Sequence, residues 1–311
     1  MRIVVLDGFT ANPGDLTWDE IKALGDVAVY DRTDEKDIVS RAKDADAVLL
    51  NKCPMTKDTM INLPRLKYIG VLATGYNVVD TAFAKESGIV VTNIPAYSTA
   101  SVAQHVFALI LEIAHHVGAH SEKCLSGAWE NAKDFCFWDY PLTELDGKTI
   151  GVIGNGAIGK RVAGIAAAFG MNVITYSPSQ NSEETLEKIY RESDIISLNC
   201  PLKDNNKEMI AGASISKMKK GVWIVNTARG GLVNEKDVKD ALISGKIGCF
   251  AADVVSVEPI RADNPLLSAP NVILTPHIAW APIEARSRLM KIACENLKSF
   301  INGNPINRVN V

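Results

Sequence analysis

A glycine-rich turn in the middle of the chain constrains the fold more than any other feature of the sequence. Residues 154–159 read G-N-G-A-I-G, directly follow the apolar run at 149–153, and open a helix-like segment that extends to about residue 169. A strand, this turn and a helix in that order predict an α/β unit that binds a dinucleotide. A glycine turn that merely joins a strand to a helix is the alternative, and the flanking pattern favours binding.

Short β-branched runs alternate with helix-like segments on both sides of this turn. The first series lies at residues 3–6, 27–30, 47–50, 68–71 and 89–92; the second begins with T-I-G-V-I-G and continues through N-V-I-T-Y, D-I-I-S-L, G-V-W-I-V-N, G-C-F-A-A-D-V and N-V-I-L-T. Alternating strands and helices predict parallel, doubly wound sheets, and 311 residues exceed the usual size of one hydrophobic core. The predicted fold class is therefore α/β, with two doubly wound parallel-sheet domains.

Two longer segments have helical periodicity, and a third has none. Apolar residues recur at helical spacing from Ser98 to about Val117 and again from Pro282 to Ile301, which predicts a helix in each place. Residues 122–146 are rich in aromatic side chains without a clear period. This segment is either an arm that packs on another subunit or a loop that covers its own core, and spacing alone does not separate the two.

Charge and cysteine content narrow the possible partners and the compartment. The net charge of −3 comes from 33 basic and 36 acidic residues with no basic block, so we expect no nucleic-acid partner. The first apolar run is too short for a secretory signal, and we expect no membrane insertion. The six cysteines form no C-x-x-C pair, which favours reduced thiols in a cytoplasmic protein over disulfides or zinc.

Each glycine of the turn has a distinct predicted role at a pyrophosphate. Gly154 permits the tight turn, Gly156 lets backbone amides approach the phosphates, and Gly159 lets the helix pack closely on the strand. Sites for NAD usually place an acidic residue at the end of the next strand, but this chain has Ser177 there and no arginine follows it. The sequence leaves open whether the cofactor is NAD or NADP.

Three polar segments follow later strands of the second series and supply one cation, one carboxylate and one imidazole. They contain Arg229 in N-T-A-R-G, Glu258 in S-V-E-P and His277 in T-P-H. Reduction of a keto acid needs a cation for the substrate's carboxylate and a proton donor for its carbonyl oxygen. We expect Arg229 to bind the substrate, His277 to transfer the proton and Glu258 to orient the imidazole. Singly, each residue has an ordinary structural explanation; their joint occurrence at strand ends favours catalysis.

With these motifs, the sequence resembles the D-isomer-specific 2-hydroxyacid dehydrogenases over nearly its whole length. The resemblance implies an oxidoreductase that transfers a hydride between NAD(P)H and a small 2-keto acid to give the D-2-hydroxy acid. Residues 135–141 and 275–281 look most like the glycerate dehydrogenases, also called hydroxypyruvate reductases, and favour hydroxypyruvate or glyoxylate.

The resemblance also assigns further site residues. It places Thr74, Gly75 and Trp280 at the substrate, together with Arg229 and His277. It places the following residues at the cofactor: Gly154, Gly156, Ile158, Gly159, Ser177, Cys200, Pro201, Thr227, Ala228, Asp253 and Ala279.

The resemblance further implies a chain divided into a split substrate domain and an inserted Rossmann domain. The substrate domain, flavodoxin-like, comprises residues 1–97 and 283–311, and the dinucleotide-binding domain comprises residues 98–282. It implies a cleft that closes on the ligand and a homodimer, with residues 118–146 as the dimerisation arm.

Three alternatives stay open at this stage. Relatives of this fold act as dinucleotide-sensing corepressors without turnover, and others oxidise formate, although those carry glutamine where this chain has Glu258. The third alternative is a metal site. His116 and His120 lie four residues apart on a predicted helix after Glu112, but no further residue has the spacing of a ligand.

Overall fold

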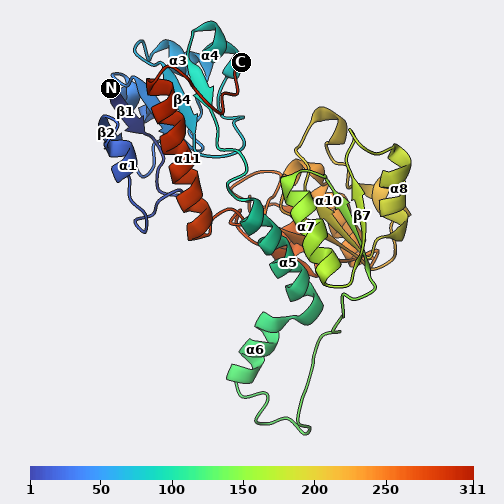
Figure 1. The fold of residues 1–311 in the computed structure, drawn as a ribbon. Coiled ribbons are helices and arrows are strands. Elements are labelled where there is room, and N and C mark those ends of the chain that lie inside the picture. Colours follow the sequence, from blue (N-terminus) through green and yellow to red (C-terminus); the bar gives the residue numbers. More distant parts are fainter. The chain divides into compact units, whose positions relative to one another are not determined.

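The chain builds two structural units, one of them inserted in the other. In the computed structural model, which describes residues 1–311, unit 1 comprises residues 1–98 and 281–311, and unit 2 comprises residues 99–280 (Figure 1). All eleven predicted strands are present with small shifts at their ends, and both sheets are parallel. The predicted α/β fold class is confirmed.

Unit 1 is a five-stranded parallel sheet covered by helices. Its strand order is β2-β1-β3-β4-β5, the order of flavodoxin-like folds. The interior is built from the apolar runs that predicted the strands, with Val4, Val48 and Ile69 almost fully buried. The elements before the insertion are β1 (Arg2–Val5), α1 (Asp19–Lys22), β2 (Asp26–Val29), α2 (Ile38–Ala42), β3 (Ala47–Leu50), α3 (Lys57–Ile61), β4 (Tyr68–Val71), α4 (Thr81–Glu86) and β5 (Val90–Thr92).

The last helix, α11 (Ile283–Ile301), packs in unit 1 although almost 200 residues separate it from β5 along the chain. Phe300 lies against Tyr68 with ring centroids 4.8 Å apart, and the Asn296 side chain donates to the backbone oxygen of Asn93 at 2.9 Å. Leu289 and Leu297 are fully buried on the same helix. The apolar stripe of this helix therefore completes the core of unit 1, although the helix comes from the other end of the sequence.

Unit 2 is a six-stranded parallel sheet with the order β11-β10-β9-β8-β6-β7. The order reverses between β6 and β8, and ligands of such sheets bind beyond the carboxyl ends of the strands at that point. Its elements after the first two helices are β6 (Thr149–Ile153), α7 (Ala157–Ala168), β7 (Asn172–Tyr176), α8 (Glu183–Glu192), β8 (Ile195–Leu198), α9 (Gly212–Lys217), β9 (Val222–Asn226), α10 (Glu235–Ile243), β10 (Ile247–Ala252) and β11 (Val272–Leu274).

Helix α5 (Thr99–His115) covers one face of the unit 2 sheet together with α7. Val106, Ile110 and Ile113 pack against Ile150 and residues near it in the buried cluster. The opposite face has its own apolar cluster, which includes residues from α8, α9 and α10. Both faces of this sheet are thus buried, as the continuous apolar runs of its strands require.

The predicted helix from Ser98 to about Val117 is interrupted near its end. The backbone of His116 has φ +47°, in the left-handed region, and a separate helix α6 (Val117–Leu125) follows at an angle of 58° to α5. Side-chain periodicity did not reveal this break. No single helix is long and apolar enough to cross a membrane, and only the bent pair α5 and α6 has that length and composition together.

Candidate active site

The glycine turn adopts the geometry that its sequence predicts. Gly154 has φ +109°, and a Cβ there would lie 2.5 Å from the backbone oxygen of Asn199 at the end of β8. A Cβ on Gly159 would lie 1.7 Å from the oxygen of Gly154, so only glycine allows α7 to approach this closely. By contrast, a Cβ on Gly156 would meet no atom within 4 Å. Two glycines are needed for the fold, whereas Gly156 leaves space open at the helix terminus.

Unsatisfied hydrogen-bond donors and acceptors lie at the start of α7 and directly after β8 and β9. Gly156 is the N-cap of α7 and offers no side-chain cap, so the first amides of the helix are available to an anion. The buried side-chain oxygens of Asn199 and Thr227, at the ends of β8 and β9, have no hydrogen-bond partner in the protein. These observations fit a bound dinucleotide, whose phosphates would lie at α7 and whose polar groups would satisfy the buried oxygens.

The loop after β7 carries neutral side chains at the position where an acidic residue usually selects NAD. The Oγ atoms of Ser177 and Ser179 are 3.1 Å apart, and the Ser177 amide donates to Asn181 Oδ1 at 3.0 Å. Asn155 of the glycine turn donates to Gln180 at 2.7 Å, which ties this loop to the turn. The loop therefore neither repels a 2′-phosphate nor binds it with a cation.

The other predicted cofactor residues follow β8 and β9, the next two strands of the sheet beyond β6. Cys200 and Pro201 follow β8, and Thr227 and Ala228 follow β9. Burial raises the pKa of the Cys200 thiol to about 11, so the thiol stays protonated at neutral pH. This cysteine therefore lines the site as an uncharged group and is not a nucleophile. Sequence reasoning overlooked Asn226, whose side chain bonds the amide of Ala228 and the oxygen of Arg229 and thereby shapes this turn.

Arg229 presents an exposed cation directly after that turn. One guanidinium nitrogen donates to the backbone oxygen of Ala228 at 2.6 Å, and no carboxylate pairs with the side chain. Its remaining N–H groups are available to a ligand. A planar guanidinium can hold a carboxylate through two parallel hydrogen bonds, so the geometry fits the predicted substrate anchor.

Glu258 and His277 form the predicted pair. The Nδ1 atom of the imidazole lies 2.6 Å from Oε2 of the carboxylate, and each side chain is 32% exposed. Because an ionised carboxylate only accepts hydrogen bonds, Nδ1 carries the proton of this bond. The other ring nitrogen, Nε2, is then the atom that can exchange a proton with a ligand.

The loop that carries His277 is held by a buried carboxylate. Asp253 is 1% exposed and accepts hydrogen bonds from the amides of Ile278 and Ala279 at 2.9 and 2.8 Å and from the Thr275 hydroxyl at 2.5 Å. Ala279 is buried beside it, and Trp280 follows, partly exposed. The structure thus shows Asp253 bound to this loop; its predicted contact with a nicotinamide carboxamide stays a prediction.

Two predicted substrate residues belong to unit 1. Thr74 follows β4, its hydroxyl donates to the oxygen of Ile94 at 2.8 Å, and its own backbone oxygen accepts from the Asn93 side chain at 2.8 Å. These bonds fix the backbone directly before Gly75. Their part in substrate binding stays a prediction.

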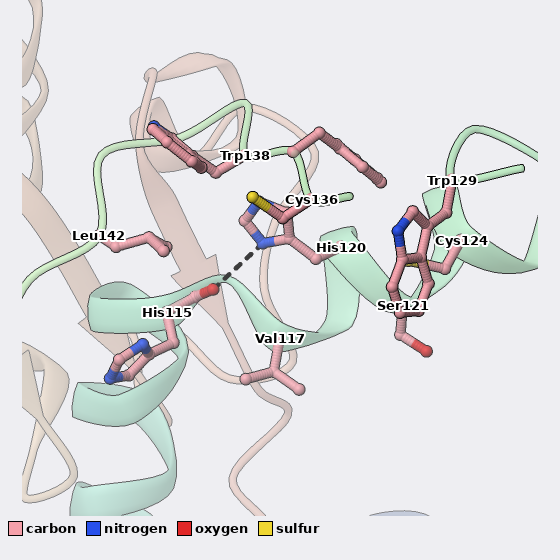
Figure 2. A pocket seen from close by; sticks show the side chains of 10 residues that line it. His115, Val117, His120, Ser121, Cys124, Trp129, Cys136, Trp138 and Leu142 are labelled. Atoms are coloured by element: carbon pink, nitrogen blue, oxygen red, sulfur yellow. Dashed lines mark hydrogen bonds between the residues drawn. The ribbon is translucent and has the colours of Figure 1, made fainter. Parts of the chain in front are cut away.

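The histidines considered as metal ligands have other contacts. His120 Nδ1 lies 3.0 Å from the oxygen of His116, and Nε2 accepts from the amide of Asp139 at 3.4 Å. No group of three or more histidine, cysteine, aspartate or glutamate side chains is arranged to hold a metal. His120 instead lines a pocket of about 570 Å³ together with Trp129, Cys136 and Trp138, and Figure 2 shows its ring beside Cys136.

Comparison with known proteins agrees with this arrangement. Residues 107–279 match the model of the D-isomer-specific 2-hydroxyacid dehydrogenase NAD-binding domain. The chain is 51% identical to a hydroxypyruvate reductase of Blautia hydrogenotrophica, over 100% of both chains.

Two solved structures are similar over almost the whole chain. The D-lactate dehydrogenase of Aquifex aeolicus, in complex with NAD and lactic acid, has a TM-score of 0.84 and 29% identity over 100% of this chain and 99% of that one. An acyclic imino acid reductase in complex with NADPH and D-Arg has a TM-score of 0.86 and 30% identity over 99% and 100%. The sequence match, the fold and the placement of the motifs agree, and the chain belongs to the D-isomer-specific 2-hydroxyacid dehydrogenase family.

Proposed function

We propose that this dehydrogenase reduces hydroxypyruvate or glyoxylate to the corresponding D-2-hydroxy acid or glycolate. The Glu258–His277 pair carries the proposal, because it supplies an oriented proton donor in the same unit as the dinucleotide turn and the unpaired Arg229. The similar hydroxypyruvate reductase of Blautia hydrogenotrophica supports this choice of substrate.

Each side chain has a definite task in the proposed reaction. Arg229 binds the substrate's carboxylate and polarises the adjacent carbonyl. A bound reduced nicotinamide supplies the hydride for the carbonyl carbon. His277, with a proton on each ring nitrogen, donates the Nε2 proton to the carbonyl oxygen. Glu258 keeps the other proton on Nδ1 and stabilises the positive charge of the ring before the transfer. In the oxidation of the hydroxy acid, His277 accepts the proton again.

Initial rates with a panel of acids test this function. We expect rapid oxidation of NADH or NADPH with hydroxypyruvate or glyoxylate and slower oxidation with a bulky 2-keto acid. Formate should not reduce NAD, because a Glu258–His277 pair is suited to a substrate with a hydroxyl proton. Cofactor binding without any keto-acid turnover would contradict the proposal and favour a sensing role.

We further propose a homodimer formed through α6 and the aromatic segment that follows it. Apolar side chains of this arm are strongly exposed in the single chain: Leu125 by 87%, Phe135 by 90% and Trp138 by 64%. In Figure 1 the arm extends away from the sheet of unit 2. Exposed apolar area of this kind favours a protein partner. The double variant Phe135→Ser, Trp138→Ser should sediment as a monomer; an unchanged mass would refute the arm interface.

We also propose that the protein is cytoplasmic. All six cysteines are free, which supports the cytoplasm as the compartment. We expect no nucleic-acid partner and no resident metal. Both NAD and NADP stay candidates, because the loop at Ser177 is neutral.

A further inference from the structure

The backbone of His277 has an unusual conformation that its neighbours must maintain. Its φ is +56°, in the left-handed region that residues with a side chain rarely adopt. The His277 amide donates to the oxygen of Thr275 at 3.0 Å, which bends the chain sharply around Pro276. Such a conformation persists at a functional site only where surrounding contacts hold it.

The contacts that hold this loop meet at Asp253. Its carboxylate accepts from Thr275 on one side of His277 and from the amides of Ile278 and Ala279 on the other. The chain on both sides of His277 is therefore held by a single group.

A second histidine joins this network from α5. The Nε2 atom of His105 lies 2.9 Å from Thr275 Oγ1 and 3.6 Å from Asp253 Oδ1, and its side chain is 18% exposed. All three residues belong to unit 2.

The chemistry of the groups determines the direction of these bonds. Asp253 accepts the Thr275 hydroxyl proton, because an ionised carboxylate only accepts hydrogen bonds. The Thr275 oxygen has then used its only proton and accepts from His105. Consequently, His105 carries a proton on Nε2, and the chain of bonds runs from His105 through Thr275 to Asp253.

We infer that His105 is a positioning residue for the reaction, acting through Thr275 and Asp253 on the loop that aims His277. This inference rests on the proposed function. Without the His105 donor, the Thr275 hydroxyl loses one partner that fixes its rotamer, and the anchor on one side of His277 loosens. Proton transfer depends on the direction of the imidazole, whereas binding of cofactor and substrate does not depend on His105.

Steady-state kinetics of His105→Leu, His105→Gln and the control Gln104→Ala test the inference. We expect His105→Leu to lower kcat for hydroxypyruvate by about 10- to 100-fold, because small misplacements of a reacting group have effects of this size. KM, cofactor Kd and Tm should change little. Glutamine places an N–H donor near the position of the His105 Nε2 atom, so His105→Gln should recover most of the rate. Gln104 is the exposed neighbour on the same helix, and its alanine variant should match the wild type.

A further variant tests the route of the effect. Thr275→Val removes the central hydroxyl, and the double variant with His105→Leu should lose no more rate than Thr275→Val alone, since both changes break one chain of bonds.

The outcomes separate this inference from the proposed function. An unchanged kcat in His105→Leu, or failure of glutamine to restore the rate, would overturn the positioning role while wild-type turnover leaves the proposed function intact. Absence of keto-acid turnover in the wild type would overturn both.

Discussion

Gly230 packs directly on Val255: a Cβ at Gly230 would lie 1.9 Å from the carbonyl carbon of Val255 and 2.0 Å from its oxygen. Arg229 precedes this glycine, and the loop of Val255 continues to Glu258. The missing side chain therefore lets the loop of Arg229 and the loop that leads to Glu258 touch through their backbones.

Replacement of this glycine should damage catalysis. In Gly230→Ala the new methyl group meets backbone, which cannot rotate away, so the two loops must separate. We expect kcat/KM to fall by about 100-fold, as a displacement near 1 Å can cause. Stability should fall by about 1–3 kcal/mol, the usual effect of overpacking, measured by denaturant unfolding.

The adjacent glycine provides a matched control. A Cβ on Gly231 would meet the end of the Leu202 side chain at 2.8 Å, and that side chain can adopt another rotamer. Gly231→Ala should therefore be clearly milder than Gly230→Ala. Equal losses of kcat/KM in the two variants would show that the contact between Gly230 and Val255 has no particular role in catalysis.

Substitution of Gly156 should affect the cofactor without disturbing the fold. Its backbone is extended and a Cβ would meet no atom, so Gly156→Val should cost no more than the roughly 1 kcal/mol of a poorer N-cap residue. The added side chain occupies the open space at the start of α7. We expect cofactor affinity in a fluorescence titration to weaken by about tenfold or more, which corresponds to about 1.4 kcal/mol.

Gly164, on the same helix and equally open, is the control for this variant. Gly164→Ala should stabilise the helix by about 0.5–1 kcal/mol and leave cofactor binding unchanged. If Gly156→Val binds NADH as tightly as the wild type, the pyrophosphate does not lie at this glycine.

The neutral loop after β7 makes cofactor preference easy to change. Ser177→Asp should raise the ratio of kcat/KM for NADH over NADPH, because its carboxylate repels a 2′-phosphate and accepts from ribose hydroxyls. Ser177→Arg should change the ratio in the opposite direction. Ser182→Asp adds the same charge at the start of α8 and should have little effect. If neither Ser177 variant changes the ratio of kcat/KM for NADH over NADPH, the ribose does not lie at this residue.

Loss of the carboxylate beside His277 should slow turnover without weakening cofactor binding. Glu258 Oε2 lies 2.6 Å from His277 Nδ1, and this bond fixes the tautomer and the direction of the ring. In Glu258→Ala the ring is free to rotate, so we expect kcat for hydroxypyruvate to fall by about 10- to 100-fold with an unchanged Kd for NADH. An unchanged kcat would be incompatible with the pair.

Much of the fold was predictable because apolar periodicity and the glycine turn are local signals. All eleven strands and the long helices follow from such patterns. The break between α5 and α6 at His116 was not predictable from such patterns. It depends on one left-handed backbone conformation and on contacts with residues that follow later in the chain, such as Tyr140.

The site was predictable to a similar extent and for a similar reason. Arg229, Glu258 and His277 each follow or approach a strand end in a recognisable motif, and the structure pairs the last two. The roles of Asn226 and His105 were not apparent, because each acts through hydrogen bonds to groups that only the fold brings near. The catalytic roles themselves stay predictions until they are measured.

Single-turnover reduction of hydroxypyruvate by enzyme-bound NADH, in the wild type and in His277→Gln, tests the central claim most directly. General acid catalysis typically contributes about 10²–10⁴-fold, so hydride transfer should slow by at least about 100-fold in the variant while NADH binds with unchanged affinity. Equal single-turnover rates in the two proteins would contradict the assignment of His277 as the proton donor.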